Sequence, residues 1–436
     1  MKKLSAIEWS TVLPVFRTYI SKFSGFVLLF AFIKINAFTS AIFLSNFTAT
    51  VADFGLFEYA LSVGLIMAVI FNFGLQGAYP YFNLKLKKEG YQSIFHAHSV
   101  LLGGLLIGLF LIHQYINSFL PTKYIFAILI GGIIALQVMA SVILKSNEIL
   151  KKAVLFDGGF FLILNVYNFH LWTTGKVFKL EFLQLIFAGY LLLLTSYHGF
   201  SFWKARKDFS LKRYLEAVRF GRHLVLSAFL IICLTGSGRI FIEWFLNFEE
   251  VGYYGFYFRF ASVTILIHQI INIVFFKKMY QSKAQILDKY FALFLKILVI
   301  GGLFIWQIIP WVFMDLLTLL QDSYSTYHRL FFILTFQMIF WIALALNENI
   351  IYREGLAGKM NKGFLIITSL MIISLWLLHS LNILTVFWIT IINMLAIFTA
   401  TEFQFSLLKQ KNINLLDMRI TGRYIMILFW LGYFFV

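Results

Sequence analysis

The sequence predicts an all-α polytopic membrane protein, and three observations lead to this prediction. First, 61% of the 436 residues are hydrophobic and only 13% are charged, whereas about a quarter of the residues in soluble globular chains are charged. Second, long apolar windows recur along the whole chain, and about 20 residues of helix cross the hydrocarbon core of a bilayer. Third, no segment alternates as barrel strands do, so helices are the way to satisfy the backbone in lipid.

The apolar windows define about twelve expected transmembrane helices. A thirteenth apolar run, Tyr424 to Val436, is too short to cross a bilayer unaided, and whether it spans stays open. The twelve expected spans cover residues 25–48, 54–80, 94–113, 123–144, 154–172, 180–203, 222–247, 252–276, 290–314, 328–350, 363–380 and 382–408.

Lysine and arginine give the expected orientation. With the N-terminus inside, 28 of the 36 basic residues fall in inward segments. The four basic residues in outward segments are Lys123, Lys176, Lys179 and Arg329. The four inside spans are Lys34, Arg239, Arg259 and Lys296. This bias follows the positive-inside rule and predicts a cytoplasmic N-terminus. The net charge of +17 therefore reflects topology, and nucleic acid is not an expected partner.

The most basic segment, Lys204 to Arg222, divides the chain into two halves of six expected helices. We predict an N-terminal lobe over residues 1–210, a C-terminal lobe over residues 211–410 and a tail with a short apolar segment over residues 411–436. Gly55 and Gly252 align the two halves. Because six is even, the repeat is parallel, which predicts two lobes around a central cavity that open to either side in turn.

Three cations inside expected spans predict the substrate site. Lys34, Arg239 and Arg259 come from both lobes, and charged residues within a bilayer usually line a functional pathway. Together they predict an electropositive cavity for an anionic substrate such as a phosphate or diphosphate. The alternative for Lys34 is that its ammonium reaches a polar membrane edge. The alternative for Arg239 is an ion pair with Glu243, one helical turn further on.

Two embedded acids, Glu58 and Asp157, are candidates for a coupling proton or cation. Both lie near the ends of expected spans, where a solvated helix cap is the competing role. A glycine pair, Gly236 and Gly238, precedes Arg239 and predicts either a kink or close helix packing.

Enzymatic and metal chemistry find no support in the sequence. The single cysteine, Cys233, lies in an apolar run, and the nine histidines show no metal-ligand spacing. Neither a zinc-protease motif nor a nucleophile-elbow motif is present. We therefore expect no metal, no cofactor and no catalytic residues.

Several segments resemble the Wzx-type flippases of O-antigen and other polysaccharides, which belong to the multidrug/oligosaccharidyl-lipid/polysaccharide exporter superfamily. The similar segments near the N-terminus are SKFSGFVLLF, DFGLFEYALSV and FNFGLQGAYPYF. The segment SGRIFIEWFLNFEEVGYYGFYFRF resembles the family's seventh and eighth spans, where an Asp-Arg or Asp-Lys pair is usual. Here Gly238 takes the place of the acid. The resemblance covers roughly Arg17 to Leu408.

The resemblance implies a function and a location. It implies a V-shaped pair of lobes in the bacterial cytoplasmic (inner) membrane that flips an undecaprenyl-diphosphate-linked oligosaccharide to the outer leaflet. The diphosphate-binding role would fall on Arg259, Arg239 and Lys34. The implied partners are the lipid-linked oligosaccharide, membrane lipid and the polysaccharide polymerase machinery.

Other functions stay open at this point. A lipid II flippase and a drug or cation transporter belong to the same superfamily, although a cation antiporter would need a dominant acid in its cavity. A membrane polysaccharide polymerase or ligase has a similar number of spans, but the long outward loop of such enzymes is missing here.

Overall fold

The computed structural model confirms the all-α fold class, since every secondary-structure element among its described residues is helical. It describes residues 9–88, 90–116, 120–269 and 282–436. The long helices are α1 Trp9–Ser45, α2 Val51–Phe71, α4 Tyr91–Tyr115, α5 Thr122–Ser146, α6 Leu150–Thr174, α7 Leu180–Ala205, α8 Leu211–Thr235, α12 Ala284–Phe313, α13 Thr318–Arg353, α14 Ala357–Ser380 and α15 Val386–Lys409. The shorter ones are α3 Leu75–Pro80, α9 Gly238–Phe245, α10 Phe248–Ala261 and α16 Leu416–Tyr433.

Eleven helices in the described part of the chain are long and apolar enough to cross a membrane. They are the eleven long helices given above, with α1 contributing residues from Leu28 onward. The difference from the twelve expected spans arises at the eighth, residues 252–276. There α10 ends at Ala261, helix resumes over residues 263–269, and the rest of the span lies outside the described residues.

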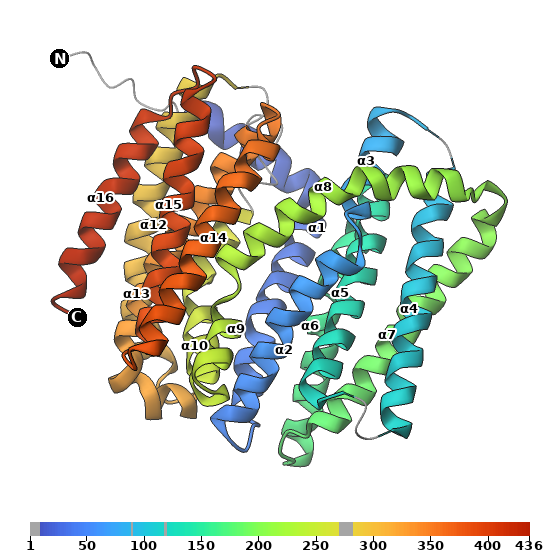
Figure 1. The fold of residues 1–436 in the computed structure, drawn as a ribbon, viewed down its shortest axis with the longest axis horizontal. Coiled ribbons are helices and arrows are strands. Elements are labelled where there is room, and N and C mark those ends of the chain that lie inside the picture. Colours follow the sequence, from blue (N-terminus) through green and yellow to red (C-terminus); the bar gives the residue numbers. More distant parts are fainter. Residues whose placement is uncertain (1–8, 89, 117–119, 270–281) are drawn as a thin grey trace.

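The helices form two groups with further helices between them (Figure 1). Helices α3 to α7 lie on one side and α12 to α16 on the other, with α1, α2, α9 and α10 between them. One hydrophobic core runs through both groups, and a smaller core lies where α3, α4 and α5 meet α8. The lobe boundaries at residues 210 and 410 stay a prediction. We call the end of the bundle that holds residues 46–50 the outer end and the opposite end the inner end, after the predicted orientation, which itself stays a prediction.

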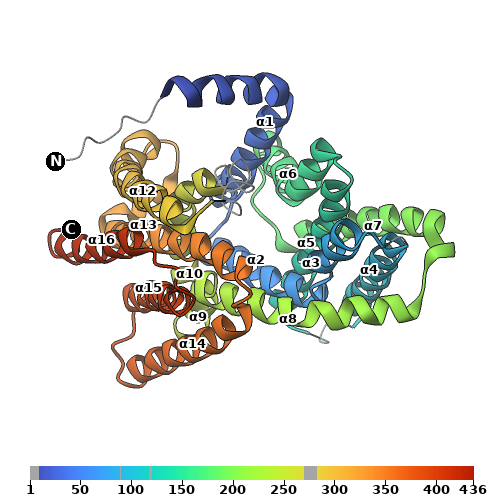
Figure 2. The ribbon, with the colours of Figure 1, turned by 90° about the horizontal axis from the view of Figure 1, so that it is seen from above.

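Helix α8 connects the two groups at the inner end. It begins at Leu211, so most of the expected basic loop from Lys204 to Arg222 is helical. Its first half packs on α3 and α4, and further along it contacts α14 and α15. Figure 2, seen from above, shows how α8 reaches from one group to the other.

The expected seventh span is interrupted where the glycine pair lies. Helix α8 ends at Thr235, and α9 starts at Gly238. Gly236 and Ser237 form the break, and the Ser237 hydroxyl donates to the Cys233 carbonyl. Gly238 also packs closely, because a Cβ there would lie 2.4 Å from the Tyr254 hydroxyl. The kink and the close packing therefore occur together.

The C-terminal tail forms a helix that lies along the second group. Helix α16 packs against α12 and α13, and Figure 1 shows it running beside them. The Asp288 carboxylate of α12 accepts hydrogen bonds from the backbone amides of Asp417 and Met418 and so holds the start of α16. The Val436 carbonyl lies 3.1 Å from His328 Nε2 on α13. The tail is thus part of the bundle.

Candidate functional site

The start of α2 and the start of α10 form the contact on which the site is built. Both helices are capped at their first turn: the Thr50 hydroxyl accepts from the Asp53 amide, and the Asn247 side chain accepts from the Glu250 amide. Such caps satisfy the free N–H groups of the first turn. Asn247 follows Thr50 by 197 residues, the same shift that separates Gly252 from Gly55. The aligned positions therefore have the same structural role.

Two glycines allow the backbones of α2 and α10 to touch. A Cβ on Gly55 would overlap the carbonyl oxygen of Phe248, and a Cβ on Gly252 would lie 2.5 Å from the carbonyl oxygen of Val51. Because Phe248 also follows Val51 by 197 residues, the two contacts are reciprocal. The repeat that the sequence suggested thus becomes a local two-fold contact at the outer end.

A buried carboxylate lies between two buried arginines one turn below this contact. Arg259 Nε of α10 donates to Glu58 Oε1 of α2 at 2.5 Å. Arg239 Nε of α9 lies 2.8 Å from Glu58 Oε2, in ion-pair contact but without the alignment of a hydrogen bond. Glu58 is 0% exposed, Arg239 6% and Arg259 7%. These three residues, here called the triad, join α2 to α9 and α10.

Small residues and aromatic rings shape the space around the triad. A Cβ on Gly255 would lie 2.6 Å from Glu58 Cγ, so the glycine makes room for the carboxylate. The Arg239 guanidinium lies over the Phe258 ring at 4.2 Å, and its Nη1 donates to the Ser62 hydroxyl at 3.3 Å. Cation–π contact of this kind stabilises a desolvated guanidinium.

The triad is not electrically balanced. Two guanidinium groups face one carboxylate, which leaves one positive charge, and Arg259 Nη2 is buried without a hydrogen-bond partner among the described residues. A buried donor without an acceptor costs about 1–3 kcal/mol, and more when it is charged. The arrangement therefore has the capacity to accept a further anionic oxygen.

A second ion pair closes the same end of the structure. Lys123 Nζ of α5 lies 2.7 Å from Glu243 Oε1 of α9. The ammonium also lies 5.7 Å from the centre of the Tyr59 ring and 5.5 Å from that of Phe248. Glu243 therefore pairs with α5 of the first group of helices, and the alternative that it pairs with Arg239 is wrong.

The predicted site residues are only partly brought together. Arg239 and Arg259 both contact Glu58 in a closed arrangement, and their role in substrate binding stays a prediction. Lys34 is half-buried on α1, 5.5 Å from the Phe30 ring centre, and it interacts electrostatically with Asp157 and Lys145. The structure groups Lys34 with that pair and not with the arginines.

The two predicted coupling acids differ in their surroundings. Glu58 is fully buried, so the interpretation of Glu58 as a solvated helix cap is wrong. The error arose because closeness to the end of a span was taken to mean closeness to water. Asp157 forms a pair with Lys145, with 2.6 Å between Oδ2 and Nζ, and both side chains are partly exposed. A coupling role for either acid stays a prediction.

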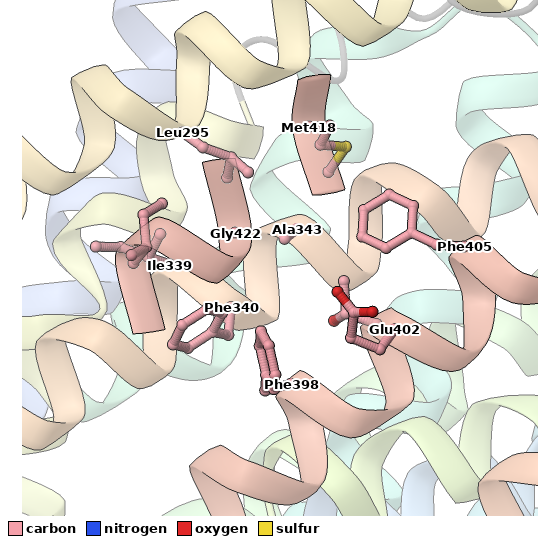
Figure 3. A pocket seen from close by; sticks show the side chains of 11 residues that line it. Leu295, Ile339, Phe340, Ala343, Phe398, Glu402, Phe405, Met418 and Gly422 are labelled. Carbon is pink, nitrogen blue, oxygen red and sulfur yellow. The ribbon is translucent and has the colours of Figure 1, made fainter. Parts of the chain in front are cut away.

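Two pockets lie away from the triad. One, of about 210 Å³, lies between α2, α3, α8 and α13, and its lining is mostly apolar: Val69, Gly74, Gln76, Gly77, Leu224, Val225, Ala228 and Tyr352. The other, of about 10 Å³, is the small space in Figure 3 between α12, α13, α15 and α16. There Glu402 points toward α16, where Arg419 Nη2 lies 2.7 Å away. Because that volume holds about one water molecule, we interpret it as a packing gap.

Comparisons with protein-family models, curated proteins and solved structures find no match for this chain.

Proposed function

We propose that this chain is a flippase that moves an undecaprenyl-diphosphate-linked oligosaccharide across the bacterial cytoplasmic membrane by alternating access. The observation that carries the proposal is the buried triad, which holds an excess positive charge between two groups of helices. Charged residues inside a membrane protein are costly, and they usually mark a functional site such as a substrate or ion pathway. The cargo class comes from the resemblance to Wzx-type flippases.

In this proposal Glu58 occupies the place of the cargo's anionic group. A diphosphate that reaches the triad competes with the Glu58 carboxylate for Arg239 and Arg259, since guanidinium groups bind phosphate oxygens well. Once the arginines are bound to cargo, Glu58 no longer joins α2 to α10. The outer end then opens with cargo in place, and a proton taken up by the released Glu58 is the simplest coupling step.

Energetics favour a closed outer end when no cargo is bound. Separating one partner from a buried ion pair costs about 3–5 kcal/mol. The Lys123–Glu243 pair and the glycine contact add to this cost. An anion of sufficient charge offsets it, so in this proposal opening depends on cargo.

The test is deletion of the gene in its own bacterium, followed by analysis of lipid-linked intermediates. We expect complete oligosaccharide to accumulate on its carrier at the cytoplasmic face and surface polysaccharide to be lost. Accumulation of incomplete chains would indicate a polymerase or ligase instead. Loss of viability through failed peptidoglycan export would indicate a lipid II flippase.

Complementation with variants tests the role of the triad. Arg259→Ala should leave membrane abundance intact and abolish surface polysaccharide. Arg329→Ala removes an exposed cation on α13 and should restore wild-type polymer, which makes it the matched control. Wild-type polymer with Arg259→Ala would remove the central claim.

A further inference from the structure

The first half of α8 has an orientation unlike that of its neighbours. Figure 1 shows it crossing the inner end of the bundle transversely to α4 and α5, and Figure 2 shows its length from above. One side of it is fixed to the bundle. Ala217 and Gly221 are buried, and a Cβ on Gly221 would overlap the Phe73 carbonyl oxygen. Tyr214 OH also lies 3.1 Å from His98 Nδ1 of α4.

The opposite side of the helix is exposed and has two distinct edges. Leu211 and Leu215 lie one turn apart and are 62% and 55% exposed. Lys212 and Arg219 lie seven residues apart, and so on one face, and both are exposed. An apolar edge therefore runs beside a basic edge.

The segment just before α8 has the same character. Lys207 is exposed in the short helical turn Arg206–Asp208, and Phe209 is 40% exposed. The charge of the nearby acid on α8 is already balanced, because Glu216 Oε1 lies 2.9 Å from Lys88 Nζ. Glu216 also interacts electrostatically with Lys212. Residues 204–222 nevertheless hold seven basic and two acidic side chains, so this surface keeps a net positive charge.

We propose that the surface formed by Lys207, Leu211, Lys212, Leu215 and Arg219 binds the phosphate-bearing headgroups of anionic phospholipids at the inner leaflet. A helix that lies in the membrane plane with one apolar and one basic edge is typical of interfacial binding. Its apolar edge enters the boundary of the acyl chains, and its basic edge meets the negative charge of the leaflet. The surface would hold the connection between the two groups of helices at the membrane, whatever the cargo.

Native mass spectrometry of the full-length protein tests this proposal. The protein is released from micelles that contain equal amounts of phosphatidylglycerol and phosphatidylcholine, and the retained lipids are counted. We expect the wild type to retain phosphatidylglycerol preferentially. Each basic side chain near an anionic surface contributes about fivefold to affinity, so the loss of three in K207Q/K212Q/R219Q should weaken retention about a hundredfold.

The matched control removes the same amount of charge from other inner segments. Lys152, Lys409 and Lys411 are exposed, so K152Q/K409Q/K411Q should retain phosphatidylglycerol as the wild type does. Equal loss in both triple variants, or equal retention of the two lipids by the wild type, would overturn the proposal. If the wild type retained another protein in place of lipid, and K207Q/K212Q/R219Q did not, the surface would be a protein-docking surface and the proposal would be overturned.

Discussion

Gly55 of α2 and Gly252 of α10 bring their two helices into backbone contact, and the position of a Cβ on Gly55 lies 2.9 Å from the Gly252 amide nitrogen. The same contact places Glu58 within reach of Arg259. Side chains on the two glycines would separate the helices and break the triad. The packing of two residues without side chains thus positions the three charged ones.

The first prediction concerns this contact. Gly55→Ala should destabilise the protein by about 1–3 kcal/mol, because the added methyl group meets backbone and not a movable side chain. Thermal unfolding of the purified protein in detergent measures the effect. Gly104→Ala is the control, since nothing lies within 4 Å of a Cβ there. Equal unfolding midpoints for the two variants would contradict the tight contact.

The second prediction uses the charge of the triad. Glu58→Gln leaves two unpaired guanidinium groups, whereas Arg259→Met leaves one balanced pair. Breaking a buried ion pair costs about 3–5 kcal/mol. We expect Glu58→Gln to lower the free energy of unfolding by about this amount, and Arg259→Met to lower it by much less. Unfolding midpoints would report the order, and a larger loss for Arg259→Met would show that the charge excess has been misjudged.

The third prediction concerns the Lys123–Glu243 pair. The two side chains are 27% and 12% exposed, and each single reversal, Lys123→Glu or Glu243→Lys, places two like charges side by side. Each should therefore cost more than the roughly 1 kcal/mol of an exposed pair and less than the roughly 3–5 kcal/mol of a fully buried one. Hydrogen–deuterium exchange at the starts of α2 and α10 should be faster in each single variant, and it should return to the wild-type rate in the double reversal. Failure of the double reversal to restore protection would mean that this pair does not help to close the outer end.

The fourth prediction concerns the attachment of α16. Asp288→Ala removes the acceptor for two backbone amides and should cost about 1–2 kcal/mol. Limited proteolysis should then cut the tail after Lys409 faster than in the wild type. Asp315→Ala changes an exposed acid and should have no such effect. An intact tail in Asp288→Ala would show that packing alone holds α16.

The fold class was predictable because apolar windows and the placement of Lys and Arg depend on local composition. The alignment of Gly55 with Gly252 was also visible in the sequence. That the two glycines touch was not, since nothing in the spacing fixes how two helices far apart in sequence approach each other. The same alignment places Gly255 at the position that corresponds to Glu58, but only the structure shows that this glycine makes room for the Glu58 carboxylate.

The charge pairing was predicted less well, for a physical reason. The sequence spacing suggested an ion pair between Arg239 and Glu243, because the two residues are one turn apart on a helix. In the structure Glu243 forms an ion pair with Lys123, and Arg239 forms one with Glu58 of another helix. Pairing in a membrane bundle depends on which buried charges face each other, and only the packed structure supplies that information. Lys123 was missed because it lies at the end of a span and was counted only as an outward charge.

Binding of undecaprenyl diphosphate to the purified protein separates the proposed roles of Glu58 and Arg259. We expect substitutions at these two residues to change the affinity for undecaprenyl diphosphate in opposite directions. Glu58→Gln removes the internal competitor and should raise the affinity, while Arg259→Ala removes the binding group and should lower it at least about tenfold. Arg329→Ala should leave it unchanged. Equal affinity in all four proteins, or a loss with Glu58→Gln as large as with Arg259→Ala, would contradict the account.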